Sequence, residues 1–352
     1  MSEFHHVSVL LEECIQGLAI KPDGIYVDGT LGGAGHSSRI AAKLTTGRLI
    51  GIDRDNVALE AAAERLKPYE DRVTLVHANF CDMDEALQEL GIDKVDGILL
   101  DLGVSSPQLD DGQRGFSYMT DAPLDMRMDV SQPLTAERIL ATYDAAELVR
   151  IFKEYGEERF SRQIARAIVA RRDKEPFTTT AQLNRLVDEV VPQAHRPAGN
   201  PAKRVFQALR IEVNGELDKL ASTLPQAANR LHVGGRLVVE SYHSLEDKTV
   251  KSFMAQGLRV DVPAGLPVIP PDAQPFFTDL TRGAIKADEH EIAANPRSAS
   301  VRLRAVEVSR EIPSRWRKRF TQTAQGLNDV KIQGSASPGR AKNTARIRTR
   351  RG

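Results

Sequence analysis

Acidic residues stand at the ends of apolar runs in the first third of the chain. The run IYVD ends at Asp28 and leads into a glycine-rich turn, Gly29–Gly35, and the run RLIGID ends at Asp53. Glycines let a backbone turn sharply beside a ligand, and a helix N-terminus after the turn favours a negative group. A carboxylate on the next strand can accept both hydroxyls of a ribose. These residues predict a nucleotide-like ligand; the alternative is that the glycines only form a tight turn.

The glycine pattern helps to choose the ligand. A G-x-G-x-x-G dinucleotide pattern starting at Gly33 would place Ser38 at the third glycine position, which is a poor fit, and the chain has no phosphate-cradling G-x-x-x-x-G-K-[ST] motif. An acid before the glycines and a ribose acid instead resemble class I S-adenosylmethionine-dependent methyltransferases. Asn79-Phe80 stands where such enzymes usually contact the adenine. S-adenosylmethionine is therefore the expected cofactor.

A further acid, Asp101, ends the run VDGILLD and precedes the loop Ser106–Leu109. An exocyclic amine is a weak nucleophile, so an enzyme that methylates it must position the amine and accept its hydrogens. The loop matches in part the [DNS]PP[FYW] loop of amino-methyltransferases, because the second proline and the aromatic are missing. Phe116 or Tyr118 is the predicted stacking face for the base. For Asp101, the alternative to a catalytic role is that its carboxylate only caps a helix or braces the loop. The candidate catalytic residues are Asp101, Ser106 and Pro107.

Alternating short apolar runs and amphipathic stretches predict βαβ units and a parallel sheet. The expected strands are Ile25–Asp28, Arg48–Asp53, Arg72–His77, Val95–Leu102, Gly234–Ser241 and an edge strand, Val301–Val308. Helical spacing marks Ser37–Leu44, Asn56–Leu66, Asp84–Leu90, Ala145–Tyr155, Arg159–Arg172 and Thr179–Val190, with another helix from Ser244. The predicted fold class is α/β, a Rossmann-like class I methyltransferase sheet with an inserted α-helical domain.

The expected domain organisation has four parts. Residues 1–113 and 213–309 form the methyltransferase domain, and 114–212 form the helical insertion, with RNA recognition as its suggested role. Residues 310–352 carry 12 Lys and Arg against 2 Asp and Glu, a net charge of +10, so the rest of this neutral chain carries −10. Its last part has almost no apolar residues, which predicts a disordered basic tail that attracts RNA or is simply solvated.

Composition limits the remaining possibilities. The 352 residues are 41% hydrophobic, enough for a sizeable core. Cys14 and Cys81 are the two cysteines, lie far apart and belong to no Cys/His cluster, so we expect no metal site and no disulfide framework. We find neither a signal-peptide pattern nor an apolar run of about 20 residues that could cross a bilayer. The chain is expected in the cytoplasm, without a membrane partner.

Val9–Glu307 resembles the bacterial small-subunit ribosomal RNA cytosine-N4 methyltransferases, the methyltransferase H family. The resemblance rests on many long segments in the same order. They are His5–Glu13, Tyr26–Ser38, Val95–Asp111, Arg114–Asp129, Tyr155–Val169, Arg204–Leu217, Ser241–Lys251 and Ala294–Ser300.

The resemblance implies methyl transfer to the N4 amine of a cytosine in the decoding region of 16S rRNA, within free rRNA or the small ribosomal subunit. With the glycine turn, the expected cofactor contacts are Gly33, Ala34, Gly35, His36, Asp53, Phe80, Asp101 and Gln108. The oligomeric state stays open, a homodimer included. The alternatives are an amino-methyltransferase for DNA or another RNA, a nicotinamide oxidoreductase, and a non-catalytic ribosome assembly factor.

Several other residues are candidates for substrate contact. Arg159, Arg162 and Arg166 share a helical spacing and would contact RNA phosphates or pair with neighbouring glutamates. His243 follows a strand and would face the substrate or serve the fold, next to an expected helix N-cap at Ser244. Arg297 would bind a phosphate or form an interdomain salt bridge.

Overall fold

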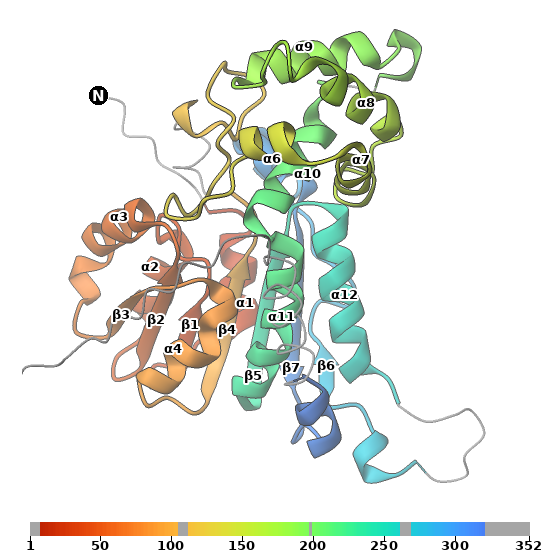
Figure 1. Cartoon of the computed structure of the whole chain (residues 1–352). Coiled ribbons are helices and arrows are strands. Elements are labelled where there is room, and N and C mark those ends of the chain that lie inside the picture. Colours follow the sequence, from red (N-terminus) through yellow and green to blue (C-terminus); the bar gives the residue numbers. More distant parts are fainter. Residues whose placement is uncertain (1–7, 105–111, 197–198, 261–268, 321–352) are drawn as a thin grey trace, which may run out of the picture.

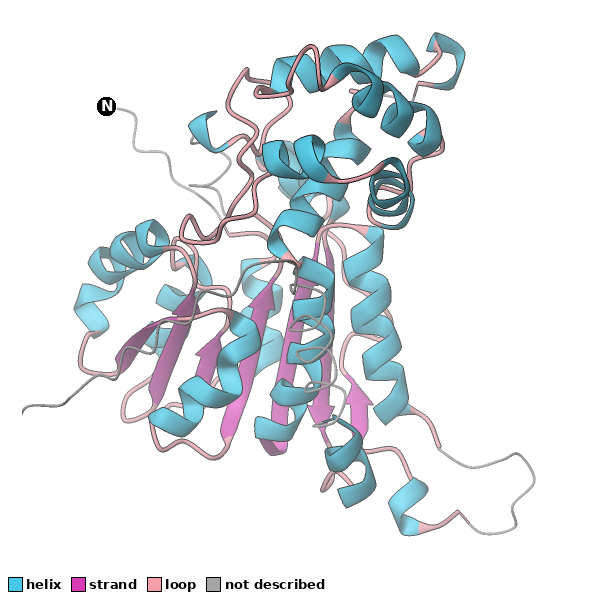
Figure 2. Cartoon of the chain, viewed as in Figure 1, coloured by secondary structure: helices cyan, strands magenta, loops and turns pink. Residues whose placement is uncertain are grey.

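The molecule is built on a seven-stranded sheet with the strand order β3-β2-β1-β4-β5-β7-β6 (Figures 1 and 2). The computed structural model describes residues 8–104, 112–196, 199–260 and 269–320. β7 is antiparallel to both of its neighbours, and the other pairs are parallel. The strands are β1 (Ile25–Asp28), β2 (Arg48–Asp53), β3 (Val73–His77), β4 (Val95–Asp101), β5 (Leu231–Ser241), β6 (Phe277–Asp279) and β7 (Arg302–Val308).

The strand order reverses between β1 and β4, because β2 and β3 lie on one side of β1 whereas β4 and β5 lie on the other. In open α/β sheets a ligand binds outside the carboxyl ends of the strands at such a reversal. Asp28 and Asp101 end β1 and β4 at this point, and Asp53 ends β2 next to them. The topology therefore brings the acids of three separate segments to one edge.

Helices cover both faces of the sheet, so the central strands β1, β2 and β4 are buried on both sides, whereas β3 is only partly buried. Successive β4 residues serve opposite faces: Leu99 packs with the first group of helices and Leu100 with the second. The first group is α1 (Leu11–Leu18), α2 (Gly35–Lys43) and α3 (Asn56–Leu66). The second is α4 (Met83–Glu89), α11 (Glu216–Arg230) and α12 (Ser244–Leu258).

A separate layer of helices stands over the carboxyl edge of the sheet (Figure 1). It has its own hydrophobic cluster, whose buried residues fall between Phe116 and Val213. Capping boxes begin two of its helices, with Asp144 before α7 and Thr179 before α9. The helices are α6 (Ala136–Thr142), α7 (Ala145–Glu154), α8 (Ser161–Arg171), α9 (Thr180–Val190) and α10 (Lys203–Asn214). A short helix, α13 (Glu289–Ala294), precedes β7.

Polar contacts join this layer to the sheet. The Arg114 guanidinium lies 2.6 Å from a carboxylate oxygen of Asp55, the N-cap of α3. Within the layer, buried Asn214 of α10 donates to the carbonyl of Met126 at 2.8 Å and accepts from the amide of Met128 at 2.9 Å. α10 then meets α11 at a single residue, Gly215, whose φ of 59° suits glycine. The insertion is thus joined to the sheet domain near its start by Arg114, and Asn214 connects its first and last segments.

The α/β fold and the six predicted strands are confirmed, with β5 starting earlier than expected at Leu231. Four elements were not foreseen: helices α1, α11 and α13, and strand β6, which is three residues long. Helices α6 and α10 were expected only as parts of a helical insertion. The helix expected over Arg159–Arg172 begins at Ser161, so Arg159 precedes it. The helix N-cap expected at Ser244 is wrong, because His243 caps α12 and forms a capping box with Glu246.

The segment after β7 also differs from its expectation. Residues 314–320 are helical, and Ile312, Trp316 and Phe320 are buried in the core beside α11 and α12. The basic tail expected from Arg310 therefore begins with a packed segment, because its three apolar residues reach the core. Residues 321–352 lie outside the described part of the chain. In the described part, no helix is both long and apolar enough to cross a lipid bilayer.

Candidate functional site

The end of β1 is braced from inside. Asp28 is 2% exposed and accepts hydrogen bonds from the Ser37 hydroxyl at 2.6 Å and the Thr30 amide at 3.1 Å. Burial raises the pKa of Asp28, and the hydrogen bond from Ser37 opposes that shift. Because one partner belongs to the glycine turn and the other to α2, Asp28 holds the turn in shape from inside the protein.

The turn itself leaves room for a ligand. Gly33 is exposed, and a Cβ added to it would meet nothing within 4 Å. Ala34 is buried in the left-handed region with φ 57° and is the N-cap residue of α2. Gly35 begins α2, and a Cβ there would lie 1.8 Å from the Ser8 Oγ. The backbone is therefore turned tightly, with free space on the side of Gly33.

Asp53 is set up as a hydrogen-bond acceptor. Its two carboxylate oxygens accept from the amides of Gly32 at 2.8 Å and Asp55 at 2.9 Å. Burial raises the pKa of the Asp53 carboxyl, and these two amide donors counteract it. Each oxygen keeps a second lone pair, so the carboxylate can still accept two hydroxyl groups. Phe80 is half-buried at the start of a 3-10 helix, Phe80–Asp82, that follows β3.

Asp101 is held on two sides yet remains accessible. The Thr30 hydroxyl accepts its amide hydrogen at 2.6 Å, and the Tyr242 hydroxyl donates to its carboxylate at 2.9 Å. The side chain is 28% exposed. Burial raises the pKa of Asp101, while the charge of His36 and the bond from Tyr242 lower it. The carboxylate is thus a fixed acceptor at the edge of the sheet.

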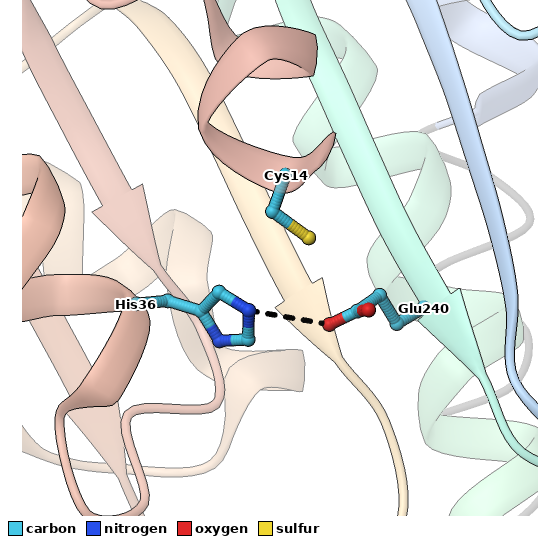
Figure 3. A group of neighbouring side chains, drawn as sticks. All are labelled: Cys14, His36 and Glu240. Carbon is cyan, nitrogen blue, oxygen red and sulfur yellow. Dashed lines mark ion pairs between the residues drawn. The ribbon is translucent and has the colours of Figure 1, made fainter. Parts of the chain in front are cut away.

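The His36 ring points toward Glu240 (Figure 3) and also lies near Asp101. Its Nδ1 lies 3.7 Å from Asp101, and its Nε2 lies 3.5 Å from Glu240 and 3.1 Å from the carbonyl of Val9. The ring is 5% exposed. If His36 contacts a cofactor, as the resemblance implies, its backbone must make that contact, because the ring is engaged inside the protein.

Three expected site residues lie outside the described residues: Ser106, Pro107 and Gln108.

The two aromatic candidates are placed differently from each other. Phe116 is 9% exposed and belongs to the core of the insertion, beneath the Arg114 guanidinium at 5.8 Å. Tyr118 is half-buried with its ring edge-on to Phe206. This packing favours Tyr118 over Phe116 as a stacking face.

The insertion presents exposed arginines. Arg162 and Arg166 lie one turn apart on α8, and Arg159 is exposed just before it. Within the described part of the chain none of the three forms an ion pair. The expected glutamate partners are engaged elsewhere. Glu157 accepts from the Ser244 hydroxyl, and buried Glu158 accepts from the amide of Phe160.

The other two basic candidates differ in exposure. The His243 side chain is 9% exposed, and its Nδ1 accepts from the amide of Glu246. His243 is therefore a capping residue of α12, which favours its structural role. Arg297 is exposed in the 3-10 helix Pro296–Ser300, on the chain leading into β7.

Sequence reasoning missed three residues at this edge: Cys14, Glu240 and Tyr242. Cys14 and Glu240 are fully buried beside His36, and Tyr242 holds Asp101. A signal existed for two of them, because Glu240 and Tyr242 surround the end of β5, at the ligand-binding edge of the sheet. Cys14 gave no signal, since its helix was not foreseen.

Comparison with known proteins gives consistent matches. A family model described as the MraW methylase family matches residues 3–309. A protein of Bifidobacterium longum named ribosomal RNA small subunit methyltransferase H is 81% identical, over 99% of this chain and 98% of its own. The proteins of the same name from Bifidobacterium adolescentis and Thermobifida fusca are 67% and 55% identical, over 91% and 87% of this chain and 94% of each of theirs. Among solved structures, an rRNA methylase from Streptococcus thermophilus aligns with 87% of this chain and 99% of its own, at 13% identity and a TM-score of 0.38.

Proposed function

Since this chain belongs to the MraW methylase family, we propose that it methylates the N4 amine of a cytosine in the decoding region of 16S rRNA. S-adenosylmethionine is the methyl donor. The relatives named as small-subunit ribosomal RNA methyltransferases support an rRNA substrate. The observation that carries the proposal is the placement of Asp53 and Asp101, which end strands on either side of β1 beside an open glycine turn.

The residues present fit the cofactor. Free space beside Gly33 admits a ligand close to the backbone, and Asp53 is fixed by two amides with lone pairs to spare for ribose hydroxyls. Phe80 stands at the end of β3, where an adenine ring would lie. When bound, the cofactor supplies an electrophilic methyl group on a sulfonium. The proposed contacts are Gly33, Ala34, Gly35, His36, Asp53, Phe80, Asp101 and Gln108.

Asp101 is proposed to position the target amine. The lone pair of this amine is delocalised into the ring, so the nitrogen must pyramidalise before it attacks, and it loses a proton afterwards. A carboxylate that accepts an amine hydrogen favours that geometry. The Tyr242 hydroxyl and Thr30 hold Asp101 in one orientation. Ser106 and Pro107 remain predicted partners in this step. The base must leave its stack to reach this edge.

The helical insertion is proposed to bind the rRNA backbone. Arg159, Arg162 and Arg166 are exposed and free of ion pairs among the described residues, as phosphate contacts require. Arg297 and Tyr118 are further candidates. The substrate is free rRNA or the small subunit in the cytoplasm, and a homodimer remains compatible with this assignment.

The test is to map modified nucleosides in small-subunit rRNA by mass spectrometry, with and without the gene. We expect one N4-methylcytidine to be lost on deletion, restored by the wild-type chain and not by Asp101→Ala. Asp71→Ala serves as the matched control, because it removes an exposed carboxylate just before β3, and it should restore the mark. A mark that survives deletion, or is restored equally by Asp101→Ala, would contradict the proposal. Equilibrium binding of S-adenosylmethionine compared with NAD separates a methyltransferase from an oxidoreductase.

A further inference from the structure

A second group of side chains lies behind the proposed cofactor turn. Cys14 of α1, His36 of α2 and Glu240 of β5 point toward one another from three elements (Figure 3). One ligand-type atom of each, namely a thiol sulfur, an imidazole nitrogen and a carboxylate oxygen, lies within 4.8 Å of the other two. Their exposures are 0%, 5% and 0%, so the group is closed to solvent.

Glu240 is the unusual member. Neither of its carboxylate oxygens has a hydrogen-bond partner among the described residues, and both are fully buried. His36, at 3.5 Å, is the one ion-pair partner that the described part of the chain gives it. A buried carboxylate without hydrogen bonds costs several kcal/mol of stability unless it is neutralised. Burial and the nearby Asp101 accordingly raise the pKa of Glu240 well above its ordinary value.

The carboxylates around this group add further negative charge to that of Glu240. Two carboxylates face the one imidazole of His36: Glu240 lies 3.5 Å from its Nε2, and Asp101 lies 3.7 Å from its Nδ1. The cluster thus has an excess of acidic groups around a single imidazole. A divalent cation would compensate for this excess, because a thiolate and a carboxylate together carry two negative charges.

We propose that Cys14, His36 and Glu240 bind a zinc-type divalent cation, with the carbonyl oxygen of Val9 as a fourth ligand. With metal–ligand bonds of about 2.0–2.3 Å, neighbouring ligand atoms of a tetrahedral site lie roughly 3.3–3.7 Å apart. The His36 Nε2 lies 3.5 Å from Glu240, within the tetrahedral range. It also forms a hydrogen bond with the Val9 oxygen at 3.1 Å, which metal binding to Nε2 would replace. Binding releases the thiol proton of Cys14 and the carboxyl proton of Glu240 to solvent, so that a thiolate and a carboxylate balance the charge of the cation.

The other nitrogen of His36 supports this assignment. Its Nδ1 faces a carboxylate oxygen of Asp101 at 3.7 Å. Metal-bound histidines commonly donate their second N–H to a carboxylate, which fixes the tautomer and the ring orientation. The cation would therefore join α1, α2 and β5 and would make His36 a donor toward Asp101. None of the three ligands is proposed to touch the reacting amine. His36 would contact the cofactor through its backbone and the cation through its ring.

The proposal reverses the expectation from sequence that the chain has no metal site. That expectation rested on spacing, and the ligands are too far apart in sequence to form a recognisable motif. The alternative is that Glu240 stays protonated and no cation binds. The two cases differ in measurable ways, without any assay of methylation.

The test is a titration of the chelator-treated full-length chain with Co²⁺, a spectroscopic substitute for Zn²⁺, followed by competition with Zn²⁺. We expect one equivalent to bind, with a thiolate-to-cobalt charge-transfer band in the near ultraviolet. Cys14→Ala should abolish the band, and Glu240→Gln should weaken binding by more than about 100-fold, since loss of a second-shell partner alone costs about 10–100-fold. The matched control is Cys81→Ala, which removes the half-buried cysteine outside the cluster and should leave both readouts unchanged.

Infrared difference spectra of the wild-type chain give a second readout that does not require the variants to fold. A carboxylic acid carbonyl band that is absent from the Co²⁺-bound form and present after chelation supports the site. No stoichiometric binding to the wild-type chain, or a thiolate band that depends on Cys81 and not on Cys14, would overturn it. Circular dichroism of each variant identifies any loss of binding that is due to unfolding.

Discussion

At the residue scale, the contrast between Asp28 and Asp53 shows how environment divides similar acids. Both end parallel strands at the same edge. Buried Asp28 accepts from a hydroxyl of α2 and from an amide of its own turn, so it stabilises the loop. Asp53 accepts only backbone amides and keeps lone pairs free for a ligand. The sequence predicts both acids at this edge, but only the hydrogen bonds separate their roles.

The first prediction concerns Asp53. Asp53→Asn should weaken S-adenosylmethionine binding by about 10–100-fold, because each hydrogen bond to a charged group contributes roughly 1.5–3 kcal/mol. Isothermal titration calorimetry measures the affinity. Asp71→Asn is the matched control: Asp71 is 63% exposed and pairs with its neighbour Arg72. Equal affinities for all three proteins would mean that Asp53 does not touch the ligand.

At the element scale, patterns of apolar residues predicted the central strands well, because buried parallel strands are nearly continuous apolar runs. They missed β6, whose three residues are too few to show a period, and α1, which lies between left-handed residues Leu10 and Ala19. They also placed the cap of α12 at Ser244. A serine followed by an acid is a common start signal, yet His243 has the extended backbone of the N-cap, and its Nδ1 accepts a helix amide.

The second prediction tests that cap. Burial alone would raise the pKa of Glu246, but the hydrogen bond and charge of His243 lower it overall. When the pKa of a carboxyl group is lower in the folded chain than in the unfolded chain, the group adds stability at pH values above its unfolded pKa. This stability disappears as the pH falls through the folded pKa. Glu246→Gln should therefore lower the free energy of unfolding by about 1–3 kcal/mol at neutral pH. This difference in the free energy of unfolding between the variant and the wild type should shrink as the pH falls below the ordinary range of glutamate pKa values.

Urea unfolding at several pH values measures this effect. Glu154→Gln is the control, because Glu154 is 59% exposed in an ion pair with Arg150, and such a change stays within about 0.5 kcal/mol. A deficit for Glu246→Gln that does not vary with pH would show that packing is lost and that the charge contributes nothing.

At the scale of the whole molecule, the sheet supplies the proposed cofactor contacts and the insertion stands over the same edge. Periodicity along the sequence indicated that the insertion is helical. It could not show which arginines are free, because this depends on where the glutamates of neighbouring segments point. The cluster of Cys14, His36 and Glu240 was hidden for the same reason, since its members meet only after the sheet has formed.

The third prediction concerns RNA. Replacing Arg162 and Arg166 with alanine should weaken binding of a small-subunit rRNA fragment and reduce the slope of log affinity against log salt by about one per lost phosphate contact. Filter binding at several salt concentrations gives both values. Arg171→Ala, on the same helix, removes an arginine that pairs with Glu189 at 2.6 Å and should have a smaller effect. An unchanged salt slope in the double variant would exclude α8 from the interface.

The fourth prediction separates the packed and the basic parts of the C-terminal segment. A chain ending at Phe320 loses seven Lys and Arg and one Asp, so its RNA affinity and salt dependence should fall while its melting temperature stays the same. A chain ending at Ser309 also loses Ile312, Trp316 and Phe320 from the core and should unfold several kcal/mol more easily. Differential scanning calorimetry distinguishes the two. Equal melting temperatures would contradict the packing of this segment.

The detour of the chain between β4 and β5 has a consequence for biosynthesis. A total of 129 residues separates Asp101 from Leu231, so a ribosome making this protein must synthesise the entire insertion before β4 can acquire its second neighbour. Until then the nascent chain exposes an unpaired, strongly apolar strand edge, which is a hazard for aggregation. Early folding of the insertion around its own core would bring the start of α11 back toward that edge and shorten the period of risk.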